Sequence, residues 1–263
     1  MVMKNIKNEF FKSTINLIGN KGLSKNFAGK FAKKYLVNNC KTSEIFVNEC
    51  KMFLDENDIM QLSLFDYEPV ETQIVKDNIK KNDIVVDVGA NIGYYTLLMA
   101  KNNAMVHSYE PESKNFNLLE KNVSINNFSS NVILYNKAVS DFNGSSKLVL
   151  SDFSPGQHKL VNSWKGTKSI DIEVTTIELD KIDFAKIDVE GAEFNVLKGM
   201  KTLPNKILIE FNAMNLEESG SNCSDFLNYL NKYTIKEVSD FGLIEPDYEK
   251  LLENKMATNL FLC

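Results

Sequence analysis

The sequence contains no arginine, so all 30 of its basic residues are lysines. Proteins favour arginine for bidentate recognition of phosphate and guanine, and its absence argues against a dedicated site for either group. The net charge is −5, and the lysines are densest near the N-terminus, where nine of the 30 precede Thr42, while acidic residues outnumber basic ones in the rest of the chain. We therefore expect no nucleic-acid partner, because such a partner needs a basic surface on the folded domain.

Cysteine pairs and long apolar runs are also missing. The four cysteines form neither a C-x-x-C pair nor a zinc-binding spacing, which predicts a reduced protein with incidental thiols. No stretch approaches the roughly 18 consecutive apolar residues of a membrane span. Residues 1–7 lack the apolar core of a secretory signal. These absences together predict a cytoplasmic protein.

The positive charge gathers in residues 1–44, which we expect to form a basic amphipathic helical appendage. Nine lysines and one glutamate precede Thr42, a net charge of +8, so the remainder of the chain carries −13. Apolar residues recur at near-helical spacing within two segments that Gly19 to Gly22 separate. Two interpretations stay open: peripheral contact with anionic lipid at the inner face of a membrane, or a cap whose aromatic side chains pack on the main domain. The second is favoured.

Residues 45–80 are expected to form a segment that leads into the main domain. A hairpin is expected over 45–54 with its turn at Asn48 and Glu49, followed by a helix that carries Pro69 in its first turn.

From residue 81 to 263, predicted strands and helices alternate. Strands are expected at 83–88, 105–109, 131–135, 184–189 and 206–211, with helices at 93–101, 112–125, 192–200 and 222–231. A β-rich insertion at 140–183 interrupts them and is expected to overhang the active site. The final strands, 233–238 and 259–263, have no crossover helix between them and should pair antiparallel. The pattern predicts an α/β fold: a doubly wound, mostly parallel sheet with an antiparallel last strand.

The region 83–110 has the form of a half-site for an adenosine-type cofactor. A buried strand runs into a turn with Gly89 and Gly93, where the backbone can bend sharply and approach a ligand. Glu110 ends the next apolar run, about twenty residues past the turn, where a carboxylate can accept hydrogen bonds from ribose hydroxyls.

The identity of the cofactor follows from the turn itself. Asp87-x-Gly89-x-Asn91-x-Gly93 is not the dinucleotide fingerprint G-x-G-x-x-G, and an acid beside the turn disfavours a pyrophosphate. S-adenosylmethionine carries a sulfonium and an ammonium and no phosphate, so it is the favoured cofactor. Two alternatives remain: an NAD-dependent oxidoreductase, which would need a phosphate turn and a hydride-site pair such as Tyr-x-x-x-Lys, and a non-catalytic Rossmann-like binding module, in which the cofactor positions would be damaged.

Several motifs resemble the FkbM family of methyltransferases. They are the runs at 87–96, 109–111, 136–140, 186–193 and 209–211, of which Lys-Ile-Asp-Val-Glu-Gly-Ala-Glu at 186–193 is the most distinctive. The likeness covers residues 45–263. It implies a class I methyltransferase Rossmann-like fold that uses S-adenosylmethionine and releases S-adenosylhomocysteine. It also implies O-methylation of a saccharide or another polyhydroxylated metabolite.

The resemblance also implies a set of cofactor-binding residues. The methionine and ribose parts of S-adenosylmethionine would contact the glycine turn. The ribose hydroxyls would bind Glu110, and Pro111 would shape the loop. Asn136 to Ala138 would border the adenine, and Asp188 would face the transferred methyl. The turn residues in this set are Asp87, Gly89, Ala90, Asn91 and Gly93.

An alcohol acceptor must lose its proton to a base, and four residues are candidates. Asp188 and Glu190 lie two residues apart, and Glu210 ends the neighbouring strand, so all three should converge at the carboxyl ends of the strands. Asp188 and Glu210 are favoured over Glu190, and His158 in the insertion is the remaining candidate. Three nearby carboxylates could hold Mg²⁺, but no histidine joins them in the sequence pattern, so a metal is not favoured.

Overall fold

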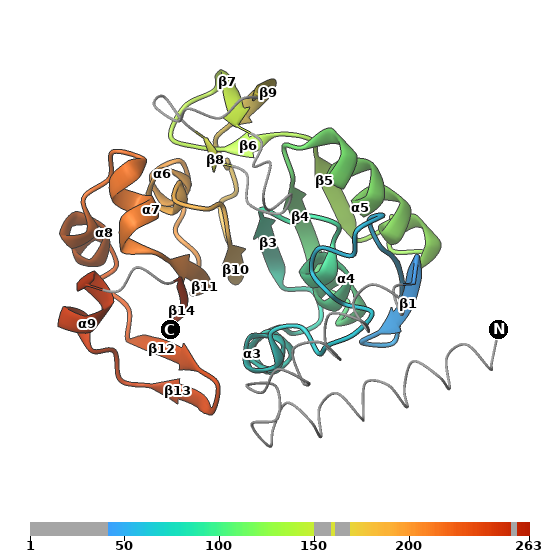
Figure 1. Ribbon diagram of the computed structural model, residues 1–263, viewed down its shortest axis with the longest axis horizontal. Helices are drawn as coiled ribbons and strands as arrows, with labels where there is room; N and C mark the ends of the chain where they lie inside the picture. The colour runs from blue at the N-terminus through green and yellow to red at the C-terminus, as the bar shows by residue number, and fades with distance from the viewer. Residues whose placement is uncertain (1–41, 150–158, 161–168, 254–256) are drawn as a thin grey trace, which may run out of the picture. The chain divides into compact units, whose positions relative to one another are not determined.

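A computed structural model describes residues 42–149, 159–160, 169–253 and 257–263, so the predicted basic helices and His158 lie outside the described residues. The chain divides into two compact units, Met1–Pro69 and Val70–Cys263. In the first unit, β1 (Glu44–Val47) and β2 (Cys50–Phe53) pair antiparallel (Figure 1). Asn48 and Glu49 form their turn with positive φ angles of 48° and 61°, at the position the sequence predicts. Within the described ranges, no helix combines the length and apolar character that crossing a membrane requires.

The second unit is built on an eight-stranded sheet in the order β13-β12-β14-β11-β10-β3-β4-β5. Its five parallel strands are β3 (Ile84–Val88), β4 (Met105–Tyr109), β5 (Val132–Tyr135), β10 (Phe184–Ile187) and β11 (Lys206–Phe211). The remaining three are β12 (Ile235–Ser239), β13 (Gly242–Ile244) and β14 (Thr258–Leu262). Because β14 runs antiparallel between β11 and β12, the predicted reversal at the end of a mostly parallel sheet is confirmed.

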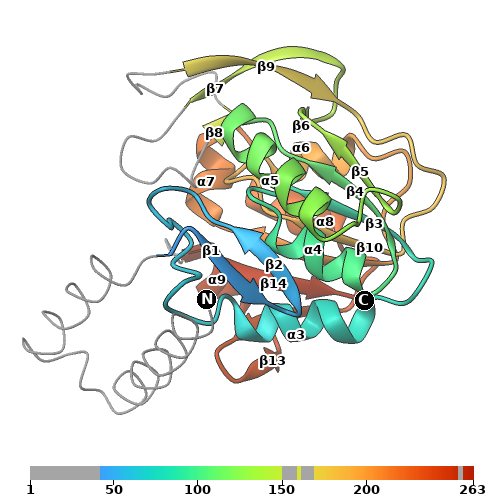
Figure 2. The ribbon, with the colours of Figure 1, turned by 90° about the vertical axis from the view of Figure 1, so that its right-hand side faces the viewer.

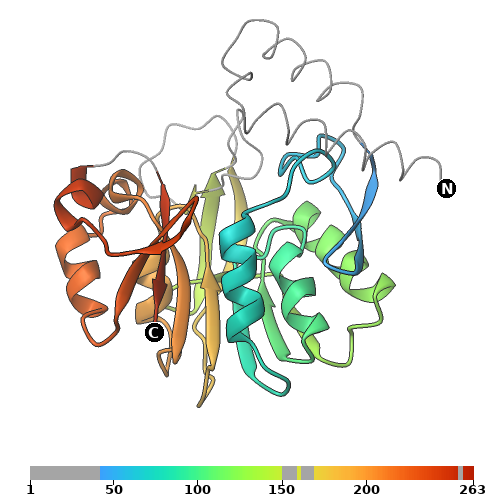
Figure 3. The same ribbon diagram turned by 90° about the horizontal axis from the view of Figure 1, so that it is seen from below.

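Helices cover both faces of this sheet (Figure 3). One face carries α3 (Pro69–Asn78), α4 (Tyr94–Lys101) and α5 (Ser113–Ile125). The other carries α7 (Ala213–Glu218) and α8 (Cys223–Tyr229), while α6 (Glu193–Lys198) follows β10 and α9 (Tyr248–Glu253) precedes β14. The short elements α7, α9 and β13 were not predicted from the sequence, because three to six residues are too few to show a periodicity.

The central strands are apolar on both faces, as strands between two helix layers should be. Ile207, Ile209 and Phe211 of β11 pack with residues of β10, β14, α6 and α8 in one buried cluster. Buried polar side chains interrupt this pattern, among them Asp87 on β3 and Lys186 in the middle of β10, each with only 1% of its surface exposed.

A separate four-stranded sheet follows β5 and lies in its own layer (Figure 2). Its strands are β6 (Ala138–Val139), β7 (Gly144–Val149), β8 (Lys159–Leu160) and β9 (Ser169–Thr175), in the order β6-β9-β7-β8. Ala138, Leu148, Ile172 and Val174 form a small apolar cluster of their own. Three of its strands, β7, β8 and β9, lie within the region 140–183 that the sequence predicts as a β-rich insertion.

Candidate active site

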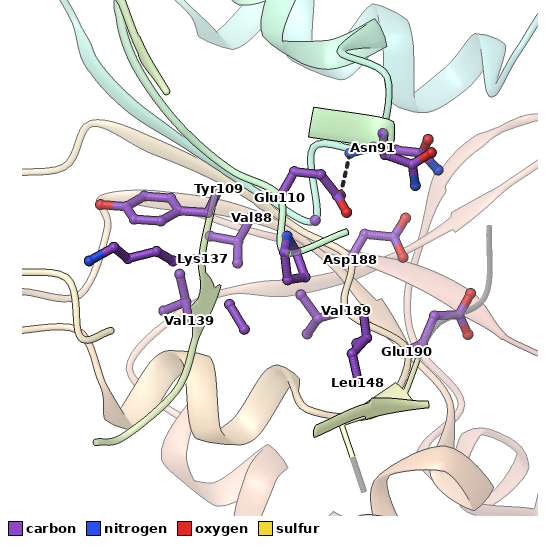
Figure 4. Close-up of a pocket in the computed structure, with 14 residues that line it drawn as sticks. Val88, Asn91, Tyr109, Glu110, Lys137, Val139, Leu148, Asp188, Val189 and Glu190 are labelled. Atoms are coloured by element: carbon purple, nitrogen blue, oxygen red, sulfur yellow. Dashed lines mark hydrogen bonds between the residues drawn. The ribbon is translucent and has the colours of Figure 1, made fainter. Parts of the chain in front are cut away.

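A pocket opens where β3, β4 and β10 end (Figure 4). Ligands of open α/β sheets bind at this edge, outside the carboxyl ends of the strands. Seven of the residues proposed from the sequence line it: Gly89, Asn91, Glu110, Pro111, Ala138, Asp188 and Glu190. The structure thus brings the core of the expected cofactor site together with two of the candidate bases.

Gly89 lets the turn after β3 pass directly against the end of β10. Its φ is +83°, and an added Cβ would lie 1.8 Å from the carbonyl oxygen of Asp188. The backbone amides of Gly89 and Ala90 both donate to the carbonyl of Tyr109 at 3.0 Å, which ties the turn to the end of β4. Only glycine fits this backbone position, since any side chain would force the two strand ends apart.

Glu110 lines the pocket just after the end of β4, with 5% of its surface exposed. One carboxylate oxygen accepts from the backbone amide of Asn91 at 2.9 Å, and the other accepts from the amide of Glu112 at 2.8 Å. Burial raises the pKa of Glu110 to about 7, and these two hydrogen bonds oppose the shift. Each oxygen has a second lone pair, so the carboxylate can also accept a ligand's hydroxyls.

Asn136 shapes the loop beside Glu110 and is not among the residues that line the pocket. Its side-chain amide donates to the carbonyls of Glu110 at 2.8 Å and of Pro111 at 3.1 Å. Ala138, two residues further on, does line the pocket.

Asp87, Ala90 and Gly93 also lie outside the pocket lining, whereas the resemblance placed them against the cofactor. Asp87 is buried inside the fold, accepts from the hydroxyl of Thr96 at 2.6 Å, and has its pKa raised to about 6 by burial. Gly93 has φ +98°, and a Cβ there would meet Leu119 of α5 at 2.6 Å. Asp87 and Gly93 thus fix how α4 packs on the sheet and on α5. The cofactor contacts expected at Asp87, Ala90 and Gly93 stay a prediction.

Asp188, Glu190 and Glu210 form a carboxylate group at the ends of β10 and β11. One oxygen from each lies within 4.8 Å of the others. Asp188 is ion-paired with Lys186 at 3.1 Å, and Glu190 adopts a positive φ of 55°.

Glu210 does not line the pocket, and one of its oxygens is buried without a hydrogen-bond partner among the described residues. Burial, reinforced by the carboxylates of Asp188 and Glu190, holds the pKa of Glu210 well above its usual range. The spacing of the three carboxylates would suit one divalent cation, but no histidine or cysteine joins them in the described part of the chain. The expected absence of a metal stays a prediction.

Glu193 is a fully buried carboxylate beside this group. One oxygen accepts from the amides of Gly191 at 3.0 Å and Val189 at 3.2 Å, so the side chain braces the turn between β10 and α6. Burial raises its pKa to about 7.

This raised pKa predicts a pH dependence of stability. The unfolded chain releases the proton near the ordinary value of 4.5, whereas the folded chain keeps it until about pH 7. Stability is therefore lost as the pH rises from about 4.5 to 7. Glu193→Gln cannot ionise, so we expect its free energy of unfolding, relative to wild type, to increase by ~2 kcal/mol between pH 5 and pH 8. Urea denaturation at both pH values measures this, and a difference that does not change with pH would contradict it.

Some pocket residues were not anticipated from the sequence. Tyr109 and Leu148 also line the pocket, whereas Lys137 lines it as a member of the predicted range Asn136 to Ala138. Tyr109 precedes Glu110, so its position beside a predicted residue was the available signal. Leu148 comes from β7, and nothing in its local sequence indicates the contact.

Comparison with known proteins agrees with this geometry. A model of the methyltransferase FkbM domain matches residues 87–236, more than half of the chain. Methyltransferase sdnD of Sordaria araneosa is 27% identical over 176 residues, covering 52% of this chain and 68% of that protein. Hexuronic acid methyltransferase AglP of Haloferax volcanii is 29% identical over 150 residues, covering 54% of this chain and 61% of that protein. A solved S-adenosylmethionine-dependent O-methyltransferase of Thermotoga maritima is 12% identical, with a TM-score of 0.42, and the match covers 78% of this chain and 69% of that one.

The sheet order and the pocket at the strand ends define a class I methyltransferase fold. The chain belongs to the FkbM family of S-adenosylmethionine-dependent methyltransferases. The alignments span 61–68% of the lengths of the two sequence relatives described above.

Proposed function

We propose that this protein transfers a methyl group from S-adenosylmethionine to a hydroxyl oxygen of a saccharide or a related polyhydroxylated metabolite. The observation that carries the proposal is the set of carboxylates from Glu110, Asp188 and Glu190 in a single pocket, at the carboxyl ends of β4 and β10, the two strands that flank β3. The name of the relative AglP, a hexuronic acid methyltransferase, supports a saccharide acceptor.

The residues of the pocket fit this cofactor. Its acidic end suits a molecule with a sulfonium and an ammonium, and would repel a pyrophosphate. Glu110 would accept from the ribose hydroxyls, since both of its oxygens keep a lone pair. Tyr109 and Lys137 line the pocket away from Asp188 and Glu190 and would border the adenine together with Ala138.

S-adenosylmethionine, when bound, supplies a methyl group activated by attachment to a sulfonium. The chain must hold the acceptor oxygen in line with that methyl, exclude water, and remove the hydroxyl proton. Asp188 is the proposed base because it lines the pocket and is ion-paired with Lys186. Glu210 is less suited to this role, since its raised pKa keeps it protonated near neutral pH. Asp188 would therefore act as the base, while Glu210 in the same cluster stays protonated.

Isothermal titration calorimetry with S-adenosylhomocysteine and with NAD tests the cofactor. We expect S-adenosylhomocysteine to bind and NAD to give no heat, because the turn lacks a phosphate site. Tight NAD binding without S-adenosylhomocysteine binding would overturn the proposal. The acceptor class is then tested by mass spectrometry of surface glycans and small metabolites from cells with and without the protein, where a missing methyl increment on a saccharide is the expected result.

A further inference from the structure

Lys186 is a buried cation directly beneath the acidic end of the pocket. It stands in the middle of β10, with 1% of its surface exposed. Its ammonium lies 3.1 Å from a carboxylate oxygen of Asp188 and 5.5 Å from the centre of the Tyr95 ring. Lysine is almost never buried so completely unless charged partners hold it there.

Carboxylates face this ammonium from several elements. Asp87 on β3 and Glu210 on β11 both interact electrostatically with Lys186, and Asp188 does so through the ion pair. Glu190 and Glu193 belong to the same electrostatic group, since both act on Glu210. The acidic residues outnumber the lysine, so the ammonium offsets only part of the negative charge below the pocket.

We propose that Lys186 is a positioning residue that, through Asp188, sets the electrostatic potential at the acidic end of the pocket. The inference rests on the proposed function. Methyl transfer removes positive charge from the cofactor, so a strongly negative site would stabilise the starting sulfonium more than the transition state. The buried ammonium limits that excess and fixes the direction of the Asp188 carboxylate.

The charge on the cofactor's sulfur gives a test that needs no acceptor. S-adenosylmethionine carries a positive sulfur and S-adenosylhomocysteine a neutral one, so the ratio of their dissociation constants reports the potential at that atom. In Lys186→Met, we expect the ratio to shift about tenfold in favour of S-adenosylmethionine, because a nearby positive charge is lost. Lys186→Arg should restore most of the wild-type ratio. Calorimetry on the full chain measures both ligands.

Lys206→Met is the matched control. Lys206 begins β11 and pairs with Phe184 at the amino end of β10, away from the pocket, and its ammonium donates to the side chain of Asn78 at 2.8 Å. Its loss changes the net charge equally and should leave the ratio unchanged.

Asp188→Asn provides a second, independent arm. It removes the negative partner, so the ratio should move in the opposite direction, towards S-adenosylhomocysteine. If Lys186→Met does not fold, Lys186→Gln, which keeps a hydrogen-bond donor near Asp188 without the charge, takes its place, and the same shift of the ratio is expected. Folded variants whose ratios equal that of wild type would overturn the role of Lys186. A wild-type protein that binds neither ligand would instead overturn the proposed function.

Discussion

Gly89→Ala is expected to abolish binding of S-adenosylhomocysteine and to lower the free energy of unfolding by several kcal/mol. The new Cβ would lie 1.8 Å from the carbonyl oxygen of Asp188 and 2.9 Å from its carbonyl carbon. Neither atom is the end of a flexible side chain, and the amide of Asp188 already donates to the carbonyl of Val88 at 3.0 Å. The ends of β3 and β10 would have to separate, and the pocket lies at those ends.

Gly220→Ala separates this steric effect from backbone strain. Gly220 has φ +86°, close to the +83° of Gly89, but an added Cβ there meets nothing within 4 Å. Alanine at this exposed position should cost only about 1 kcal/mol and leave S-adenosylhomocysteine binding intact. Urea denaturation and calorimetry on both variants give the comparison. Equal losses of stability would show that the contact with Asp188 does not matter.

The sequence predicts the central sheet well because buried parallel strands read as continuous apolar runs. The antiparallel ending could also be predicted, since no helix of crossover length separates the last two long strands; α9, which lies between them, has only six residues. The pairing of strands in the small sheet β6-β9-β7-β8 was harder to predict. Its strands are held by a local apolar cluster around Leu148 and Ile172, and short sequence patterns do not determine which strands pair.

Membership of a sequence motif does not show which of its residues line the pocket. Asp87 and Gly93 belong to the same motif as Gly89, yet one bonds to Thr96 and the other packs against Leu119. Sequence spacing places these residues near the turn but does not determine which of them face the pocket. The buried position of Lys186 does have a signal in the sequence, since this lysine lies inside the apolar run from Phe184 to Ile187, two residues before a candidate base.

Glu110→Ala is expected to weaken binding of S-adenosylhomocysteine by about 100-fold. The Glu110 carboxylate lines the pocket and would accept charge-assisted hydrogen bonds from the ribose hydroxyls. Its loss also leaves the amide of Asn91 without the partner that orders the turn. Glu120→Ala, which removes an exposed carboxylate from α5, is the control and should bind like wild type. Calorimetry measures the three dissociation constants, and an unchanged value for Glu110→Ala would rule out a ribose contact.

The pH dependence of the same binding gives a sharper test of Glu110. Burial raises its pKa to about 7, so the side chain is mostly protonated at pH 6 and mostly ionised at pH 8. The ionised form accepts the hydroxyls better, so wild-type affinity for S-adenosylhomocysteine should fall about tenfold from pH 8 to pH 6. Glu110→Ala removes the titrating group and should lose this dependence, whereas Glu120→Ala should keep it. A wild-type affinity that rises or stays level as the pH falls would mean that the protonated carboxyl binds the ligand, and the roles of donor and acceptor at the ribose would then be reversed.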